Sequence, residues 1–448
     1  MIFLYAFAVL ISSYFIVGGI LTLINVFHTF SDINKKKGEV QSQNDYYSII
    51  IPVYHENMII TDTIKYFSGF SEGHDCEIFI VGTDRENEQD SGHQTTIQCA
   101  SEYLKRHPEI KNVTLLSAPT AFKHKVGQMN YAFSIIRNSR NIGGYIGVYD
   151  ADSRPDPKTL DCLSRLLDSR SVNGRPCPAV VQQVSSYCEK SEKLRGIWGC
   201  MALADALSQT KWALGFEYPL YKLYSWCCRR QKRVRPLIYC IGHGCFVRVS
   251  FLEKIGGFPE YNQNDDLSLG YLVSVLGEEA TALPALDFCE ISPDQRTTIK
   301  QYRGWYSGSA RYYQDIRYYS EYYRCPLNAF QRLVFRVQGG LRNFLWAWRG
   351  MLWVLLLLCG ILTGSGFLLL CVLADMVAYV ILPAIATAFS LRRNGLLKII
   401  YPRLIFTLAL APINFVIRGI GPAIASVFPA KSVQTDTYKV ERIQDHDI

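Results

Sequence analysis

The first 31 residues form an apolar stretch without Asp, Glu, Lys or Arg, and charge first appears at Asp32, just before Lys35, Lys36 and Lys37. A stretch of this length is long enough to cross a bilayer as a helix. Lysines directly after such a helix place its carboxyl end in the cytoplasm. A cleaved signal peptide fits less well, because a basic start is missing and the apolar stretch is too long. We therefore predict an N-terminal transmembrane helix at 1–31.

From Tyr46 onward, short β-type runs alternate with helical patterns. Strands separated by helices are typical of a parallel sheet. The β-type runs are 47–53, 77–81, 113–116 and 145–149, and the helical patterns are 94–106 and the segment from 125 onward. This alternation predicts an α/β domain with a mostly parallel sheet at 45–330.

The last third of the chain returns to long apolar segments. Arginines alternate with Phe and Trp in 331–349, a pattern typical of an interfacial helix. Residues 350–374 and 376–391 carry no charge and predict two spans that meet around Gly364. Segment 404–430 contains two prolines and an arginine, and predicts either a third span or a re-entrant segment. We expect an interfacial helix at 331–349, a transmembrane region at 350–430 and a tail at 431–448.

The composition agrees with this mixed layout, since 49% of the 448 residues are hydrophobic and 19% are charged. The formal net charge is +8, and basic clusters at 35–37, 229–235 and 392–393 lie beside apolar segments. Such clusters suit anionic membrane lipids better than nucleic acid, and no nucleic-acid-binding motif is present. The 14 cysteines include no C-x-x-C pair, which favours reduced thiols over zinc ligands or a disulfide framework.

The clearest chemical feature is a pair of acids, Asp150 and Asp152, directly after the β-type run 145–149. In open α/β sheets, ligands lie beyond the carboxyl ends of the strands. Hard oxygen ligands suit Mg²⁺ or Mn²⁺ bridging to phosphates. The pair therefore predicts a metal and diphosphate site; an acidic turn is the alternative, since Asp is also a common turn residue.

Six short motifs occur in a defined order along the chain. They are P-V-Y-H-E at 52–56, K-V-G-Q-M-N at 125–130, D-A-D at 150–152, G-G-F at 256–258, D-D-L-S-L-G at 265–270 and Q-Y-R-G-W at 301–305. With this order and the membrane layout, the chain resembles the membrane-embedded processive glycosyltransferases of family 2, which include cellulose, chitin and hyaluronan synthases. The resemblance covers roughly residues 46–305 and implies a GT-A-type nucleotide-sugar-binding fold.

The resemblance also implies roles for individual residues. Asp150 and Asp152 would hold the metal, and Asp266 would be the general base that takes the acceptor proton. Lys125 would be a cation near the diphosphate, although a solvated lysine at the start of a helix is the alternative. The other residues expected to bind the donor are Pro52, Tyr54, Glu56, Asp84 and, in addition to its metal role, Asp150. The remaining residues expected to act in catalysis or acceptor binding are Gln301, Arg303 and Trp305.

Two departures from the family pattern, and one histidine within a matching segment, leave questions open. The loop that normally reads the nucleobase has a different sequence, so that either Asp84 or Glu86 is the substitute acid. Gly304 stands where relatives carry arginine, and Arg303 lies one residue early. His243, between two glycines, is either a contact to acceptor or metal or a structural turn residue.

The expected activity is an inverting, metal-dependent transfer from a nucleotide sugar, UDP-linked, to a growing polysaccharide or oligosaccharide. The expected partners are the donor, a glycan or lipid-linked acceptor, and membrane lipids. The catalytic domain would be cytosolic, in a plasma or inner membrane. Two alternatives remain: transfer of a single sugar to a lipid-linked acceptor, and a catalytically silent membrane scaffold.

Overall fold

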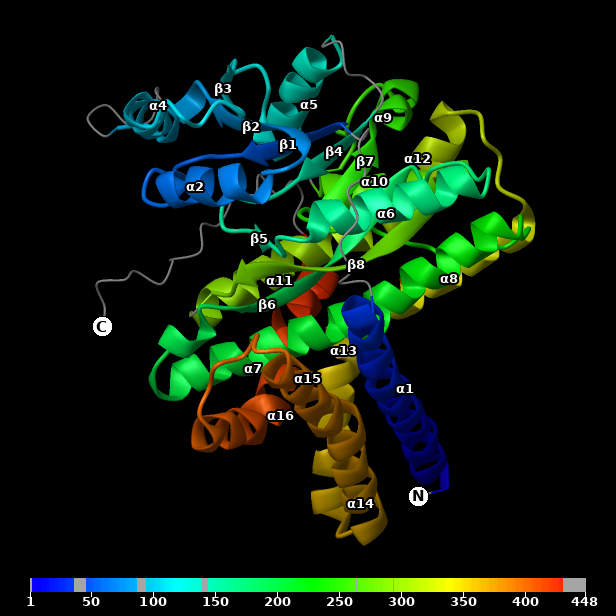
Figure 1. Ribbon diagram of the computed structural model, residues 1–448. Helices are drawn as coiled ribbons and strands as arrows, with labels where there is room; N and C mark the ends of the chain where they lie inside the picture. Colours follow the sequence, from blue (N-terminus) through cyan, green and yellow to red (C-terminus); the bar gives the residue numbers. More distant parts are fainter. Residues whose placement is uncertain are drawn as a thin grey trace.

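The computed structural model describes residues 2–35, 46–86, 94–138, 144–262, 264–292 and 294–429. An α/β domain forms one end of the molecule, and α1 (Ile2–Lys35) and α14 (Gly366–Asp375) project away from it (Figure 1). The predicted tail at 431–448, Gly143, Lys36 and Lys37 lie outside the described residues.

The α/β domain contains one eight-stranded sheet of order β3-β2-β1-β4-β7-β6-β8-β5. Its strands are β1 (Tyr46–Pro52), β2 (Asp75–Thr83), β3 (Val113–Ala118), β4 (Tyr145–Val148), β5 (Arg154–Pro155), β6 (Val180–Glu189), β7 (Cys245–Arg248) and β8 (Ala280–Glu290). Strands β3, β2, β1 and β4 are parallel to one another, and so are β6 and β8. Strand β7 is antiparallel to both β4 and β6, and β5 is antiparallel to β8. The prediction of an α/β fold with a mostly parallel sheet is therefore confirmed.

Helices cover both faces of this sheet, because most strands are apolar on both sides and need two covering layers. On one face α2, α4 and α6 pack over Tyr47, Ile49 and Ile51 of β1. On the other face α5, α7, α8 and the end of α1 pack over Ile50 and the β6 side chains. The helices of the domain are α2 (Ile60–Phe70), α4 (Thr96–Arg106), α5 (His124–Ile136), α6 (Thr159–Val172), α7 (Gly196–Trp212), α8 (Tyr218–Arg229), α9 (Val249–Ile255), α10 (Asp265–Leu276), α11 (Gln295–Ala310) and α12 (Tyr312–Tyr322). Two short turns, η1 (Ser191–Lys193) and the π-helical η2 (Ala213–Glu217), flank α7.

Among the residues that the structure describes, four helical segments are long and apolar enough to cross a membrane: Ile2–Lys35, Ala329–Thr363, Gly366–Arg393 and Tyr401–Val427. They correspond to α1, α13 (Ala329–Thr363), the run of α14, the π-helical η3 (Met376–Ile381) and α15 (Leu382–Arg393), and α16 (Tyr401–Val427). Gly364 ends α13 in the left-handed conformation, as the predicted turn between two spans requires.

Two helices pass through the predicted boundaries of the apolar region. α13 runs unbroken from its Asn328 cap to Gly364, across the predicted division at 349/350 between an interfacial helix and a span. The segment predicted as span or re-entrant is also one helix, α16, which keeps Pro412 and Pro422 within it. Gly421 of α16 approaches the backbone of α11 so closely that a Cβ would lie 2.3 Å from the Ile299 carbonyl oxygen. Thus α16 connects the apolar region directly to the α/β domain.

Candidate active site

The sheet register determines which segments surround the D-A-D loop. Val148, the last residue of β4, pairs with Cys245 of the antiparallel neighbour β7. The chain that leaves β4 toward Asp150 therefore runs beside the chain that enters β7, which contains Gly242 and His243. Two hydrogen bonds hold this loop in place. Thr63 Oγ1 donates to the Ala151 carbonyl at 2.5 Å, and the Ser153 amide donates to the Asp150 carbonyl at 3.0 Å.

Lys125 lies at the centre of this arrangement. Its Nζ donates to Asp150 Oδ1 at 2.5 Å and to the Gly242 carbonyl at 2.7 Å. Burial acts to lower the pKa of Lys125, but Asp150, Asp265 and Asp266 outweigh it and the pKa is raised. Lys125 is thus a permanent cation shared by carboxylates from two different parts of the chain.

The second group of carboxylates, Asp265 and Asp266, begins α10. The Cys240 amide donates to the Asp266 carbonyl at 3.3 Å, which fixes the start of α10 against the segment that leads to Gly242. Asp266 Oδ1 accepts from the Leu267 amide at 2.8 Å. Burial raises the pKa of Asp266, and burial together with the neighbouring Asp266 raises the pKa of Asp265 to about 7. A carboxylate with a raised pKa is suited to take a proton near neutral pH.

Asn130 ties α5, which carries Lys125, to the loop before α10. Its Nδ2 donates to the Phe258 carbonyl at 3.0 Å and to Glu260 at 2.5 Å, and its Oδ1 accepts from the Phe258 amide at 2.7 Å. Gly257 has φ +114°, and a Cβ there would lie 2.6 Å from Asn130 Oδ1. Glycine is therefore required for this close approach.

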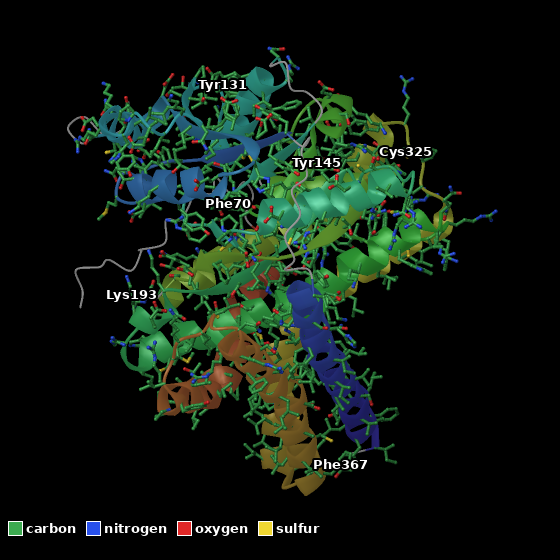
Figure 2. All side chains as sticks on the ribbon, viewed as in Figure 1. Phe70, Tyr131, Tyr145, Lys193, Cys325 and Phe367 are labelled. Atoms are coloured by element: carbon green, nitrogen blue, oxygen red, sulfur yellow. The ribbon has the colours of Figure 1, made fainter. Side chains whose placement is uncertain are left out.

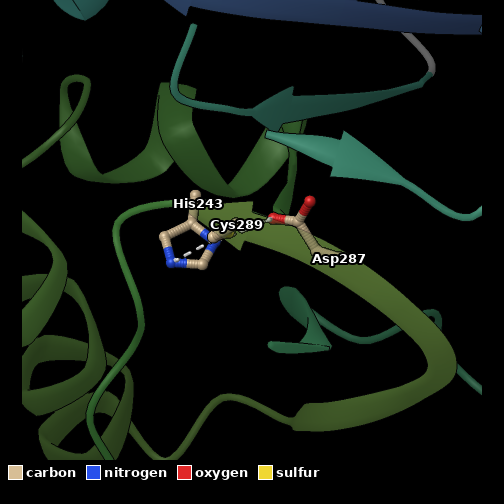
Figure 3. A group of neighbouring side chains, drawn as sticks. All are labelled: His243, Asp287 and Cys289. Carbon is tan, nitrogen blue, oxygen red and sulfur yellow. Dashed lines mark hydrogen bonds and ion pairs between the residues drawn. The ribbon is translucent and has the colours of Figure 1, made fainter. Parts of the chain in front are cut away.

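His243, Asp287 and Cys289 form a buried group (Figure 3), and Ser153, just after the D-A-D motif, lies 3.4 Å from Asp287 Oδ2. His243 Nδ1 lies 2.7 Å from Asp287 Oδ2 and 3.4 Å from Cys289 Sγ. The first distance is that of a hydrogen bond, whereas nitrogen and oxygen ligands on one tetrahedral zinc ion would be about 3.3 Å apart. Burial opposes a charged imidazole, but the carboxylate of Asp287 raises the pKa of His243. Two alternatives were predicted for His243, a contact to acceptor or metal and a structural turn residue. The structural alternative agrees with this geometry, because the internal hydrogen bond to Asp287 fixes the ring.

The two candidate nucleobase acids lie in different environments. Glu86 is 2% exposed, and its Oε1 accepts from Thr96 Oγ1 at 2.7 Å and from the His55 amide at 3.0 Å. It therefore holds two loops together and is not presented to a ligand. Asp84 follows β2 and accepts from Ser117 at 2.5 Å at an exposed position, so Asp84 remains the predicted base-reading acid.

Pro52 ends β1, and Tyr54 and Glu56 follow in the loop beyond it, at the same edge of the sheet as Asp150. The Tyr54 ring lies 5.8 Å from the guanidinium of Arg85, next to Asp84. The structure therefore brings the predicted donor-binding residues of the first motif to the edge that carries Asp84 and Asp150.

Gln301, Arg303 and Trp305 lie on α11. Trp305 is 40% exposed, and its ring meets the buried Tyr302 edge-on at 5.4 Å. Arg303 is exposed. The predicted roles of these three residues in catalysis or acceptor binding stay predictions.

Sequence reasoning missed Asp287 and Cys289 of β8. Asp287 is completely buried, its Oδ1 makes no hydrogen bond, and its Oδ2 is 3.4 Å from Ser153 of the D-A-D loop. The sequence does contain a signal for Asp287, because it is an acidic residue inside the apolar run Ala280–Cys289. A carboxylate buried in such a strand needs a partner.

The family model described as "Glycosyl transferase family group 2" matches residues 145–391. Among solved structures, the chain is similar to mannosyltransferase PcManGT from Pyrobaculum calidifontis in complex with GDP-Man and Mn²⁺, with a TM-score of 0.44 and 14% identity over 93% of this chain and 99% of that chain. No curated protein sequence matches the chain significantly.

Proposed function

Because the chain belongs to glycosyl transferase family group 2 and is a glycosyltransferase, we propose that it catalyses an inverting, metal-dependent sugar transfer from a UDP-sugar to a saccharide acceptor at the membrane. One observation carries this proposal. Lys125 contacts Asp150 on the donor side and lies beside Asp265 and Asp266, so that donor and base groups meet around one cation.

The residues at the end of β4 fit a divalent metal. Asp150 has a side chain that is 42% exposed, and Asp152 follows two residues later, so both offer carboxylate oxygens at the strand end. Such hard ligands suit Mg²⁺ or Mn²⁺ completed by diphosphate oxygens. When bound, the ion would neutralise the charge that develops on the leaving nucleotide.

The chain's own groups would carry out the transfer in a single displacement. Asp266 takes the proton of the acceptor hydroxyl, whose oxygen forms a bond to the anomeric carbon as the bond from that carbon to the diphosphate breaks. Lys125 lies on the donor side and stabilises the diphosphate as it leaves. One displacement inverts the anomeric centre, and no covalent enzyme intermediate is required.

The acceptor in this proposal is a growing glycan, with Trp305 as a flat apolar platform on which successive sugars stack. Transfer of one sugar to a lipid-linked acceptor is the second candidate. The displaced arginine, with Gly304 in the family's position, favours this second candidate. A silent scaffold would have no use for the buried, charged arrangement around Lys125.

The proposed orientation places the α/β domain in the cytosol, where nucleotide sugars are available, and the apolar helices in a plasma or inner membrane. The four helices long and apolar enough to span a membrane support this arrangement.

The direct test is incubation of purified protein with a panel of labelled nucleotide sugars, Mn²⁺ or Mg²⁺, and extracted membrane acceptors. We expect transfer from a UDP-sugar that stops in excess chelator, with an inverted anomeric centre in the product by NMR. Retention of configuration, or undiminished transfer in chelator, would refute the mechanism. A one-sugar lipid product would replace the glycan acceptor by the second candidate.

A further inference from the structure

Gln182 of β6 is a buried residue outside the groups that take part in the proposed transfer. It is 2% exposed and lies on an interior strand, where a side-chain amide needs hydrogen-bond partners. Its partners are all on the backbone of the short segment 241–244, which leads into β7. Gln182 Nε2 donates to the His243 carbonyl at 2.9 Å and to the Gly244 carbonyl at 3.2 Å, and its Oε1 accepts from the Ile241 amide at 3.0 Å. One side chain therefore holds both ends of the segment.

The same segment is also held from β8. His243 Nδ1 is hydrogen-bonded to Asp287 Oδ2 at 2.7 Å (Figure 3). Gly244 has φ +61°, and a Cβ there would lie 2.9 Å from the Gln183 Cβ and 3.2 Å from Asp287 Oδ2. The positive φ and these close contacts restrict the position to glycine. Segment 241–244 is thus fixed by two neighbouring strands and packed closely against them.

Gly242, in the middle of the segment, lies between the donor and base groups of the site. Its carbonyl accepts from Lys125 Nζ at 2.7 Å, and the same Nζ donates to Asp150 Oδ1 at 2.5 Å. A Cβ on Gly242 would lie 3.4 Å from Lys125 Nζ and 3.3 Å from Asp266 Oδ2. Because the Gly242 carbonyl is one of the acceptors that hold the Lys125 ammonium, the position of the segment determines where this cation lies.

These contacts all belong to the α/β domain. Gln182 pairs with Cys245, directly after the segment, in the register of β6 and β7. Strand β7 pairs in turn with β4, which begins at the buried Tyr145. Figure 2 shows Tyr145 within the α/β domain and Phe367 at the opposite end of the molecule. A substitution of Gln182 is therefore expected to act on the site and not on the apolar helices.

We infer that Gln182 is a positioning residue for donor binding, which holds segment 241–244 so that the Gly242 carbonyl fixes Lys125 Nζ toward the donor diphosphate. This inference rests on the proposed function, in which Lys125 lies on the donor side. Gln182 acts only through the backbone segment and the lysine. An ammonium that loses a fixed acceptor takes up other positions, and a displacement of about 1 Å in such a site can lower its efficiency by roughly 10²-fold.

The test is a calorimetric titration of UDP, in the presence of Mn²⁺, into the full chain in phosphatidylcholine nanodiscs. Gln182→Met keeps the side-chain length and removes all three hydrogen bonds to the segment. We expect the affinity for UDP to fall by about 10- to 100-fold, the usual scale when a residue that supports a ligand-binding group is removed.

Gln331→Met is the matched control. Gln331 is also 2% exposed, and its amide also holds a backbone segment, donating to the Arg235 carbonyl at 2.9 Å and accepting from the Arg235 amide at 2.8 Å. The midpoints of thermal unfolding should fall by similar amounts in the two variants, because each leaves buried backbone groups without a partner. Gln331→Met should nevertheless bind UDP as tightly as the wild type.

A double-mutant cycle with Lys125→Met separates positioning from a general loss of stability. Substitutions that act through the same contact are not additive. Gln182→Met should therefore weaken UDP binding in the wild type and cause no further loss in Lys125→Met. A merely structural role of Gln182 would lower the unfolding midpoint without this dependence on Lys125.

Three results would overturn the inference: unchanged affinity for UDP in Gln182→Met, an equal loss of affinity in Gln331→Met, or an undiminished effect of Gln182→Met in Lys125→Met. Should Gln182→Met fail to fold, Gly244→Ala decides in the same cycle, because its Cβ would displace the same segment through the contact with Gln183. Wild-type affinity in Gly244→Ala would then overturn the inference.

Failure of this inference is distinguishable from failure of the proposed function. A wild type that binds UDP with Mn²⁺, together with a Gln182→Met variant that binds it equally well, would remove the positioning role and leave the donor site in place. A wild type that binds no UDP in the presence of Mn²⁺ would overturn the proposed function, and this inference with it.

Discussion

Replacing Lys125 by methionine should shift the pH dependence of transfer, because the variant keeps the side-chain length but removes the cation shared by Asp150 and Asp266. Lys125 Nζ and Asp266 Oδ2 lie 3.4 Å and 3.3 Å from the position that a Cβ of Gly242 would take. The two charges are thus within about 7 Å, and their attraction is about 2 kcal/mol at an effective dielectric constant of about 20. With water and salt screening, this corresponds to a shift of about one pKa unit.

The sign follows from the role of Asp266. Burial raises the pKa of Asp266 and Lys125 lowers it, so losing Lys125 raises that pKa further. Since the base must be unprotonated, transfer falls as the pH drops through this pKa. We therefore expect the acid limb of the kcat profile to move up by about one pH unit in Lys125→Met.

The assay is initial-rate transfer between pH 5 and 9 with donor in excess, together with donor binding at pH 7.5. Donor affinity should also fall, by about 10- to 100-fold, because a charge-assisted contact on the diphosphate side is lost. The matched control is Lys123→Met, an exposed lysine at the start of the same helix, which should change neither quantity. An unshifted acid limb in Lys125→Met, with normal donor affinity, would refute the shared-cation reasoning.

Three further changes test other parts of the site. Asp152→Asn should abolish metal-dependent turnover, measured as nucleotide-sugar hydrolysis during a Mn²⁺ titration, and full activity would remove Asp152 from the metal site. Asn130→Ala should lower the free energy of unfolding by about 1–3 kcal/mol in a denaturant titration, because it leaves the buried Phe258 amide without its acceptor. The exposed Asn138→Ala is the control, and an equal loss there would contradict the argument. Trp305→Ala should shorten the products more than it slows the first transfer, since stacking is lost at each addition, and unchanged product length would exclude a sliding platform.

The local pattern of the sequence was sufficient to predict the first four strands, β1 to β4, and the acids that follow β2 and β4. An apolar run that stops at Asp150 and is followed by Pro155 contains both the strand and its end within ten residues. The same holds for Gly364, because an apolar helix that meets glycine ends there. That α13 continues across 349/350 has a related reason, since a change from amphipathic to apolar character alters the surroundings of a helix without interrupting its hydrogen bonds.

Contacts between distant segments could not be predicted in this way. The position of Lys125 against Asp150 and Gly242 depends on β7 pairing antiparallel to β4, and nothing local to Cys245 specifies that neighbour. The burial of Glu86 could not be predicted either, because it depends on Thr96, 10 residues further along the chain. The surroundings of Lys211 could not be predicted either. It is a charged residue in a mostly apolar helix, and it lies near two arginines only because α13 and α16 pack close to α7.

The measurement that tests the central claim most directly is the comparison of donor binding and transfer in Asp266→Asn. The claim is that Asp266 acts as the base while Lys125, Asp150 and Asp152 hold the donor. Calorimetry with UDP and Mn²⁺ should then give an affinity within about threefold of wild type, while transfer falls by about 10²-fold or more. If donor affinity collapses in parallel with transfer, Asp266 belongs to the donor site, and the proposed division between base and donor groups is contradicted.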